Sequence, residues 1–215
     1  MVKGGLYDGA GSEEDIERDF STQVDDVLSG EDAISTHLKV REHTPRIFLE
    51  IGLRDKPMLI TSVHAKTEIG QKIKGKNIHN INIEVFKELP KLLENPAIIM
   101  ESTRNGSIVT FVNAVDNANN PIMCAIKING KGYYNSVEIE SNVIASVYGK
   151  DTNPIGFIET AIKENRVLYW NKKMSQRLFA IPGLQLPDNL NNLDSNNIIR
   201  KTKVFVNTFS KKKKI

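Results

Sequence analysis

Two histidines, His64 and His79, lie among basic residues in the first half of the chain. His64 is in SVHAKTEIG, next to Lys66, and His79 follows the basic segment KIKGKN. Histidine is the side chain that most readily gives and takes protons near neutral pH. A single histidine is ordinarily a surface or core residue, but histidines in a basic protein are suited to cleaving RNA without a metal.

Metal-free RNA cleavage requires three kinds of group. A base takes the proton of the ribose 2′-hydroxyl, whose oxygen attacks the adjacent phosphorus, and an acid protonates the leaving 5′-oxygen. A lysine or arginine stabilises the added negative charge, while hydroxyl and amide groups position the phosphate. The candidates are His64 and His79 for proton transfer, Lys66, Arg104 and Lys127 for charge, and Asn142, Ser146 and Tyr148 for positioning.

The polar candidates lie in SNVIASVYGK, residues 141–150, which is typical of a strand with an unusual number of hydrogen-bonding groups. Side chains alternate between the two faces of a strand. This period places Asn142, Ile144, Ser146 and Tyr148 on one face. The apolar residues between them form the other, which we expect to contact helices.

Aromatic residues concentrate in the second half of the chain, and single-stranded bases stack on such rings. Trp170, near Lys173, is a candidate for this role, with core packing as the alternative interpretation. The aromatic residues concerned are Tyr133, Tyr134, Tyr148, Tyr169 and Trp170.

Several common catalytic motifs are missing from the sequence. There is no GxxxxGK[ST] phosphate loop, no GxGxxG, no HExxH and no GxSxG. The one cysteine, Cys124, lies in the apolar run PIMCAIKI and is expected to be buried. No run of 18 apolar residues is present, so we expect no membrane-spanning helix. Neither a metal nor a cofactor is expected.

Charge is distributed unevenly along the 215 residues. Residues 1–36 contain ten acids and two bases, a net of −8, so the remainder must carry +11 to give the total of +3. A basic body favours an anionic partner such as a nucleic acid, the alternative being an ordinary solvated surface.

Hydrophobic periodicity predicts helices, then strands, then a helix–strand–helix segment. Pro90 should kink or split the third helix. Asn105-Gly106 marks a hairpin. The first expected helix begins at Thr44-Pro45, and the others cover 61–73, 81–96, 153–166 and 171–181. Thr61 or Ser62 can cap the second helix and Asn82 the third. The expected strands cover 97–102, 107–115, 121–128, 136–149 and 167–170.

The predicted fold class is α+β. N-terminal helices pack on one face of a four-stranded antiparallel meander, which is followed by the helix–strand–helix segment, and the other face of the sheet is free to bind substrate. The predicted organisation is an acidic leader or linker over residues 1–36, with at most one weak helix, a domain over 37–205 and a basic tail over 206–215.

Five segments together carry a resemblance to a known family. From about residue 37 to 205, the chain resembles the C-terminal toxin domain of MuF-type phage capsid proteins, in the phage branch of the barnase–EndoU–colicin–RelE nuclease fold. The resemblance rests on the order and spacing of the five segments together. They are TPRIFLEIGLRDKPMLITSVH, IHNINIEVFKELPKLLENPAIIMES, VDNANNPIMCAIKINGKGYYN, SNVIASVYGK, and VLYWNKKMSQRLF followed by GLQLP.

The resemblance implies a metal-independent ribonuclease toxin that acts on RNA in the bacterial cytoplasm and is neutralised by an acidic immunity protein. It also implies a capsid or delivery module upstream, and therefore possible association with the virion. His64, His79, Ser146 and Tyr148 would be the pocket residues, with Asn142 in support. Two other hypotheses stay open: a non-catalytic phage domain that binds nucleic acid, and a toxin of different chemistry, such as ADP-ribosyl transfer or DNA cleavage.

Overall fold

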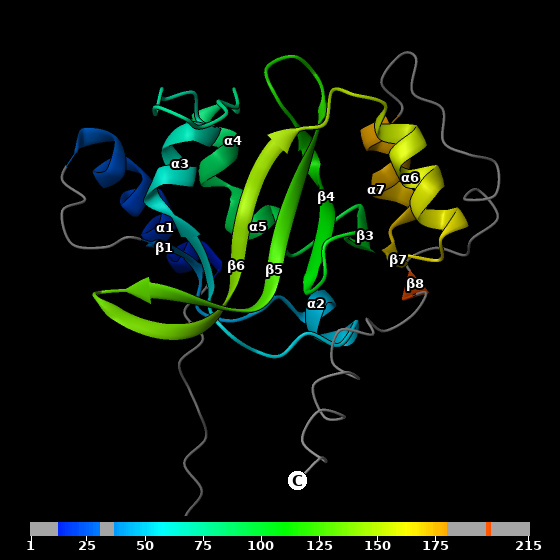
Figure 1. Cartoon of the computed structure of the whole chain (residues 1–215), viewed down its shortest axis with the longest axis horizontal. Coiled ribbons are helices and arrows are strands. Elements are labelled where there is room, and N and C mark those ends of the chain that lie inside the picture. Colours follow the sequence, from blue (N-terminus) through cyan, green and yellow to red (C-terminus); the bar gives the residue numbers. More distant parts are fainter. Residues whose placement is uncertain (1–12, 31–36, 180–196, 199–215) are drawn as a thin grey trace, which may run out of the picture.

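The computed structural model describes residues 13–30, 37–179 and 197–198, with side chains from residue 20 (Figure 1). One mixed sheet runs through this part of the chain, with strand order β1-β2-β6-β5-β4-β3-β7-β8. The strands are β1 (His37–Arg41), β2 (Met58–Thr61), β3 (Ile98–Glu101), β4 (Ser107–Val115), β5 (Pro121–Tyr134), β6 (Val137–Gly149), β7 (Val167–Trp170) and β8 (Asn197–Ile198). The helices are α1 (Glu13–Ser29), α2 (Arg46–Glu50), α3 (Ser62–Glu68), α4 (Ile83–Lys87), α5 (Leu89–Leu92), α6 (Pro154–Lys163) and α7 (Lys172–Phe179).

The predicted four-stranded antiparallel sheet is wrong. The hairpin-linked strands β3 to β6 are present, but they form only the centre of a sheet that has two further strands on each side. One of these, β2, pairs with β6 in parallel, with Leu59 opposite Val143. A four-residue apolar strand shows no alternation of its own, and its partner lies some 80 residues away. Local periodicity therefore gives no signal for this pairing.

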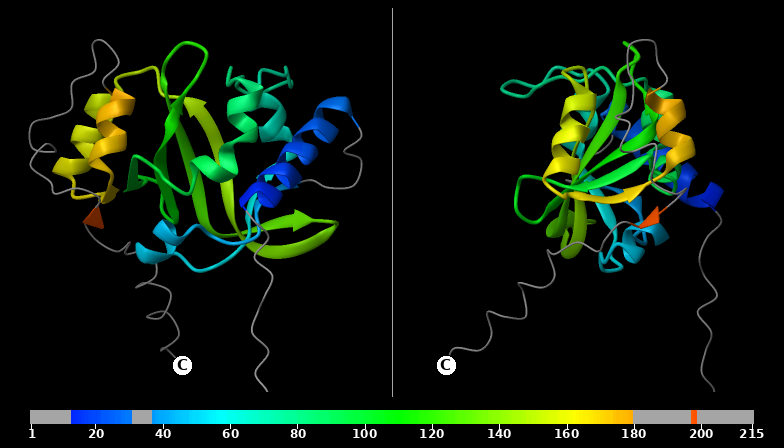
Figure 2. Two further views of the ribbon diagram at one scale, coloured as in Figure 1. Left: turned by 180° about the vertical axis from the view of Figure 1, so that it is seen from behind. Right: turned by 90° about the vertical axis from the view of Figure 1, so that its right-hand side faces the viewer.

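Helices cover both faces of the sheet rather than one (Figure 2). One core joins α1 to α5 with the sheet and includes Phe20, Phe48 and Phe86. The second core lies on the opposite face and joins α6 and α7 to the β3, β4 and β7 region through residues such as Phe111 and Phe179. These last two helices lie at one end of the sheet (Figure 1), which leaves part of β5 and β6 uncovered on their face.

Helix α1 packs in the first of these two cores. The sequence predicted a leader or linker over residues 1–36, with at most one weak helix. Phe20, Val24 and Val27 are buried, at the spacing of one helical face. Gln23 also exchanges two hydrogen bonds with the backbone of Lys39, at 2.8 and 3.1 Å. These bonds occupy a donor and an acceptor of β1, which is the edge strand of the sheet.

Local predictions about two helix caps, a break near Pro90 and the burial of Cys124 are confirmed. The Thr61 hydroxyl caps α3 by accepting a hydrogen bond from the His64 N–H at 3.0 Å, and the Asn82 side chain caps α4. The segment predicted as one helix is split at Glu88, and Pro90 lies in the first turn of α5. Cys124 is free and buried. No helix in the described part of the chain is long and apolar enough to cross a membrane. The predicted tail, 206–215, lies outside the described residues.

Candidate active site

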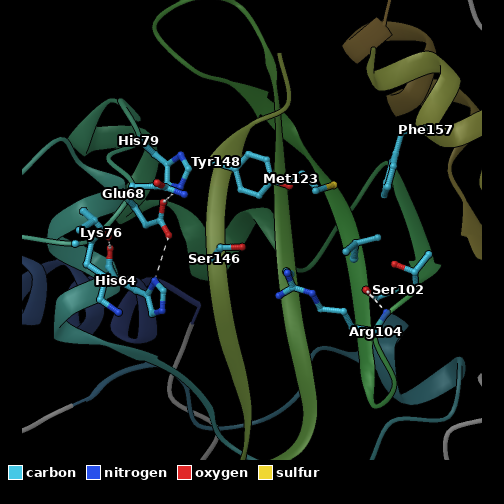
Figure 3. Close-up of a pocket in the computed structure, with 16 residues that line it drawn as sticks. His64, Glu68, Lys76, His79, Ser102, Arg104, Met123, Ser146, Tyr148 and Phe157 are labelled. Atoms are coloured by element: carbon cyan, nitrogen blue, oxygen red, sulfur yellow. Dashed lines mark hydrogen bonds and ion pairs between the residues drawn. The ribbon is translucent and has the colours of Figure 1, made fainter. Parts of the chain in front are cut away.

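A pocket of about 610 Å³ opens on the uncovered part of the sheet (Figure 3). One wall comes from α3 and the segment that follows it. The floor comes from β4, β5 and β6, and the far wall from the β3–β4 turn and α6. The four residues that the resemblance implies for the pocket all line it: His64, His79, Ser146 and Tyr148. Residues far apart in the sequence are thus brought together at one place.

Helix α3 supplies His64 and Glu68, which lie four residues apart and therefore on one helical face. The Glu68 side chain is 1% exposed, and its Oε1 lies 3.8 Å from Nδ1 of His64. The same oxygen accepts a hydrogen bond from the Val147 N–H at 3.1 Å. This bond ties α3 to β6 beyond the point at which β2 ends, so the helix is held against the sheet at the pocket.

His79 approaches the same carboxylate from the other side. Its Nε2 lies 3.6 Å from Oε2 of Glu68, and its ring stacks on Tyr148 with centroids 5.1 Å apart and planes 25° apart. The backbone N–H of His79 donates to the Thr67 carbonyl at 2.9 Å. His79 is therefore positioned by three separate contacts, and Figure 3 shows Glu68 between the two histidines.

The second oxygen of Glu68 has no hydrogen-bond partner among the described residues, although it is buried. Leaving a buried carboxylate oxygen without a partner costs stability. The charge also acts on its surroundings: burial and, after it, the negative charge of Glu68 raise the pKa of the Cys124 thiol far above its usual range. A carboxylate beside an imidazole is an arrangement that active sites use to orient a histidine.

A bulge in β6 brings Ser146 and Tyr148 to the pocket. Ser146 pairs with Ala125, but Ile144 already pairs with Ile126, so Ala145 has no partner on β5. The alternation of faces is therefore reversed at this point. The prediction that Asn142, Ile144, Ser146 and Tyr148 share one face is wrong, because a strictly alternating strand cannot be assumed across a bulge.

Ile144 belongs to the core on the face opposite the pocket, whereas Tyr148 packs with the second core, on the pocket face. Burial raises the pKa of the Tyr148 phenol, and the positive charge of Arg104 acts in the opposite direction. The phenol is therefore neutral at physiological pH, and it can donate a hydrogen bond.

Arg104 brings a positive charge to the pocket from the β3–β4 turn. Its backbone N–H donates to the Ser102 hydroxyl at 3.1 Å, which orders the turn. In Figure 3 its side chain extends over the sheet toward Ser146, on the side opposite the histidines. The exposed Lys76 also lines the pocket, on the same side as the two histidines (Figure 3). Lys76 and Arg104 thus place a cationic group on each side of the pocket.

The other candidates lie elsewhere. The amide of Asn142 is buried, where it donates to the Thr44 hydroxyl at 3.0 Å and the Arg54 carbonyl at 3.3 Å. Trp170 is 1% exposed in the second core, so the core-packing interpretation applies to it. Lys66, Lys127 and Lys173 are not among the residues that line the pocket. Each of the three predictions rested on the type of residue and on a neighbour in sequence, and neither fixes where a side chain lies.

Sequence reasoning missed Glu68, Lys76, Ser102 and Phe157 as pocket residues. Only Glu68 had a usable signal: it lies four residues after His64 in a segment predicted to be helical, which places both on one face. The remaining three reach the pocket through loop geometry and the packing of α6. Among the described residues, no group of three or more His, Cys, Asp or Glu side chains is arranged to hold a metal ion.

Comparison with known proteins identifies a family. The model of the phage MuF-C-terminal domain matches residues 70–177, a segment that contains every pocket residue except His64, Thr67 and Glu68 of α3. No curated protein and no solved structure matches the chain. The family model covers half of the sequence, and the chain therefore belongs to the phage MuF-C-terminal domain family.

Proposed function

We propose that this domain is a metal-independent endoribonuclease of phage origin, which acts as a toxin and cleaves RNA by attack of the 2′-hydroxyl. The observation that carries the proposal is the buried Glu68 carboxylate, 3.8 Å from His64 and 3.6 Å from His79, in a pocket that Arg104 lines from the opposite side. Two proton-transfer groups and a separate cation are the minimum set for this reaction.

The reaction assigns one step to each group. One histidine takes the proton of the 2′-hydroxyl, and the 2′-oxygen forms a bond to phosphorus while the bond from phosphorus to the 5′-oxygen breaks. The other histidine donates its proton to that 5′-oxygen. The products are a 2′,3′-cyclic phosphate and a 5′-hydroxyl. Arg104 stabilises the charge on the phosphorane, and Ser146 and Tyr148 offer hydroxyl groups to its oxygens.

Glu68 acts through the histidines. It touches neither phosphate nor leaving group, because Val147 and the two rings surround it. A buried carboxylate that lies between the two imidazoles orients both rings. This role would account for a carboxylate at position 68, where an apolar side chain would cost less free energy to bury.

The test uses the purified protein and single-stranded RNA in the presence of EDTA. We expect fragments that end in a 2′,3′-cyclic phosphate, and no cleavage of the same sequence with 2′-O-methyl groups. Binding without cleavage, with affinity that falls steeply as salt rises, would instead identify a nucleic-acid-binding domain. Cleavage of DNA or of the 2′-O-methyl strand would show a different chemistry.

Glu68→Gln is expected to lower kcat for RNA cleavage by about 10- to 100-fold, leaving KM nearly unchanged, because the change removes an orienting charge and no substrate contact. The protein should be at least as stable as the wild type, since a buried charge is lost while the side-chain carbonyl still accepts from Val147. Unfolding in denaturant measures this. A variant that is both less stable and fully active would show a merely structural role.

The orienting role also predicts non-additivity. Once His79 is replaced by alanine, Glu68→Gln should have a smaller effect than it has in the wild type, because the carboxylate has lost one of the groups that it orients. The double-mutant cycle on kcat measures this coupling. Effects of the two substitutions that multiply independently would contradict a shared function.

A further inference from the structure

The pocket has two chemically unlike ends. The histidines, Glu68 and Lys76 form a charged end, whereas Val109, Met123 and Phe157 form an apolar end on β4, β5 and α6. Val109 and Met123 are almost fully buried, and Phe157 is partly exposed. Figure 3 shows Phe157 across the pocket from the histidines, with Met123 between them. The proposed phosphate chemistry uses the histidines, Arg104 and the hydroxyls of Ser146 and Tyr148, and it gives no role to the three apolar residues.

The apolar end does not suit a phosphate, which requires cations and hydrogen-bond donors. Its chemistry suits a flat ring with apolar faces and a polar edge. Aromatic and apolar side chains hold the faces of unstacked bases, while hydroxyl groups contact their edges. Ser102 and Thr103 line the same pocket, and Figure 3 shows Ser102 on the side of the pocket that carries Phe157. A pocket of about 610 Å³ is in the size range that binds ligands much larger than a phosphate ion.

Phe157 is held rigidly enough to serve as a stacking surface. Its ring meets Phe111 nearly edge to face, at 6.4 Å and 71°, and the Lys150 ammonium lies 5.7 Å from its centroid. Phe157 is in the first turn of α6, where the Asn153 side chain accepts from the Gly156 N–H at 2.9 Å. A ring whose position is fixed before binding loses little entropy on binding.

We propose that the apolar end binds one nucleobase next to the scissile phosphate, with Phe157 as its main contact, so that the substrate is unpaired RNA. The inference rests on the proposed function for its substrate class. A base within a duplex is covered on both faces by its neighbours and must leave the stack before it can enter the pocket. Helical RNA is therefore cut only where a base is free.

The main experiment combines a protein change with a substrate change. Phe157→Leu keeps an apolar side chain of similar size and removes the ring. The matched control is Phe179→Leu, because Phe179 also packs on Phe111, at 5.5 Å, but is not a pocket residue. Substrates are a single-stranded RNA cut at one step and the same RNA with an abasic ribose on either side of that step.

At one of the two abasic positions, we expect kcat/KM of the wild type to fall by about 5- to 100-fold. Phe157→Leu should lower kcat/KM on the intact RNA by a similar factor and should be insensitive to the abasic change at that position. Phe179→Leu should respond as the wild type does. If abasic substitution affects wild type and Phe157→Leu equally at both positions, no base contacts Phe157 and the proposal is overturned.

A binding measurement separates this proposal from the proposed function. We expect nucleoside 3′-monophosphates to bind the wild type more tightly than ribose 3-phosphate, and Phe157→Leu to bind the two equally. If RNA is not cleaved but this difference is seen, the nuclease function fails and the base subsite stands. If RNA is cleaved and the wild type binds both ligands equally, the subsite fails and the nuclease stands.

Discussion

Replacing His64 or His79 with alanine is expected to lower RNA cleavage by about 10²- to 10⁴-fold, the loss that accompanies removal of a general acid or base. Both rings line the pocket and lie on either side of Glu68. Single-turnover cleavage of a short RNA measures the effect. Thermal unfolding should show both variants folded, because neither ring is fully buried.

His43→Ala is the matched control for this prediction. His43 is exposed and also pairs with a carboxylate, that of Asp55 at 3.0 Å, but it is not a pocket residue. Its replacement should leave cleavage within about twofold of the wild type, as is usual for a surface residue away from the site. Full activity of both His64→Ala and His79→Ala would show that the reaction does not use these groups.

A sulfur-substituted substrate distinguishes the acid from the base. When sulfur replaces the scissile 5′-oxygen, the leaving thiolate departs without being protonated, so the acid is no longer required. The variant that lacks the acid should regain most of its lost rate on this substrate, and the variant that lacks the base should not. Equal behaviour of the two variants would contradict separate acid and base roles.

The sequence predicted several pocket residues, among them His64, His79 and Tyr148, better than it predicted the sheet that brings them together. His64 and Tyr148 were recognisable by residue type, and the Thr61 cap places the start of α3 correctly. Such features depend on a few neighbouring residues. The parallel pairing of β2 with β6 depends on residues about 80 positions apart and has no local signal.

The β6 bulge shows a second limit of sequence reasoning. Ser146 was assigned to the pocket face, and it does line the pocket, but Ile144 was assigned to the same face and lies in the opposite core. Alternation gives the relative facing of residues only within an uninterrupted strand. Nothing in VIASV marks Ala145 as the extra residue, because its position follows from how β5 and β6 pair.

Burial explains why other predicted site residues do not line the pocket. Trp170 and Asn142 have side chains that nucleic-acid sites use, but the structure places both in the interior, where one packs and the other connects loops by hydrogen bonds. Phe157 was not predicted as a site residue, because it has no lysine close to it in the sequence as Trp170 has. It reaches the pocket because α6 covers only one end of the sheet. Which aromatic ring meets substrate is therefore a property of the fold.

Phe20→Ala is expected to destabilise the protein by about 3–5 kcal/mol, the range for truncating a fully buried phenylalanine. Phe20 is completely buried and lies 5.7 Å from Phe86 of α4, ring centroid to centroid. Val24 and Val27 extend the same buried face. The loss of free energy of unfolding, measured by urea denaturation of the full chain, tests whether α1 belongs to the folded unit.

Asp26→Ala provides the control, because Asp26 is exposed on the same helix, and it should change stability by no more than about 0.5 kcal/mol. If residues 1–36 were only a linker, Phe20→Ala would be equally neutral. At a temperature where the Phe20→Ala protein is still folded, RNA cleavage should stay close to that of the wild type. Phe20 packs in the core on the face of the sheet opposite Met123 and Phe157, so its loss weakens the scaffold and leaves the pocket groups in place.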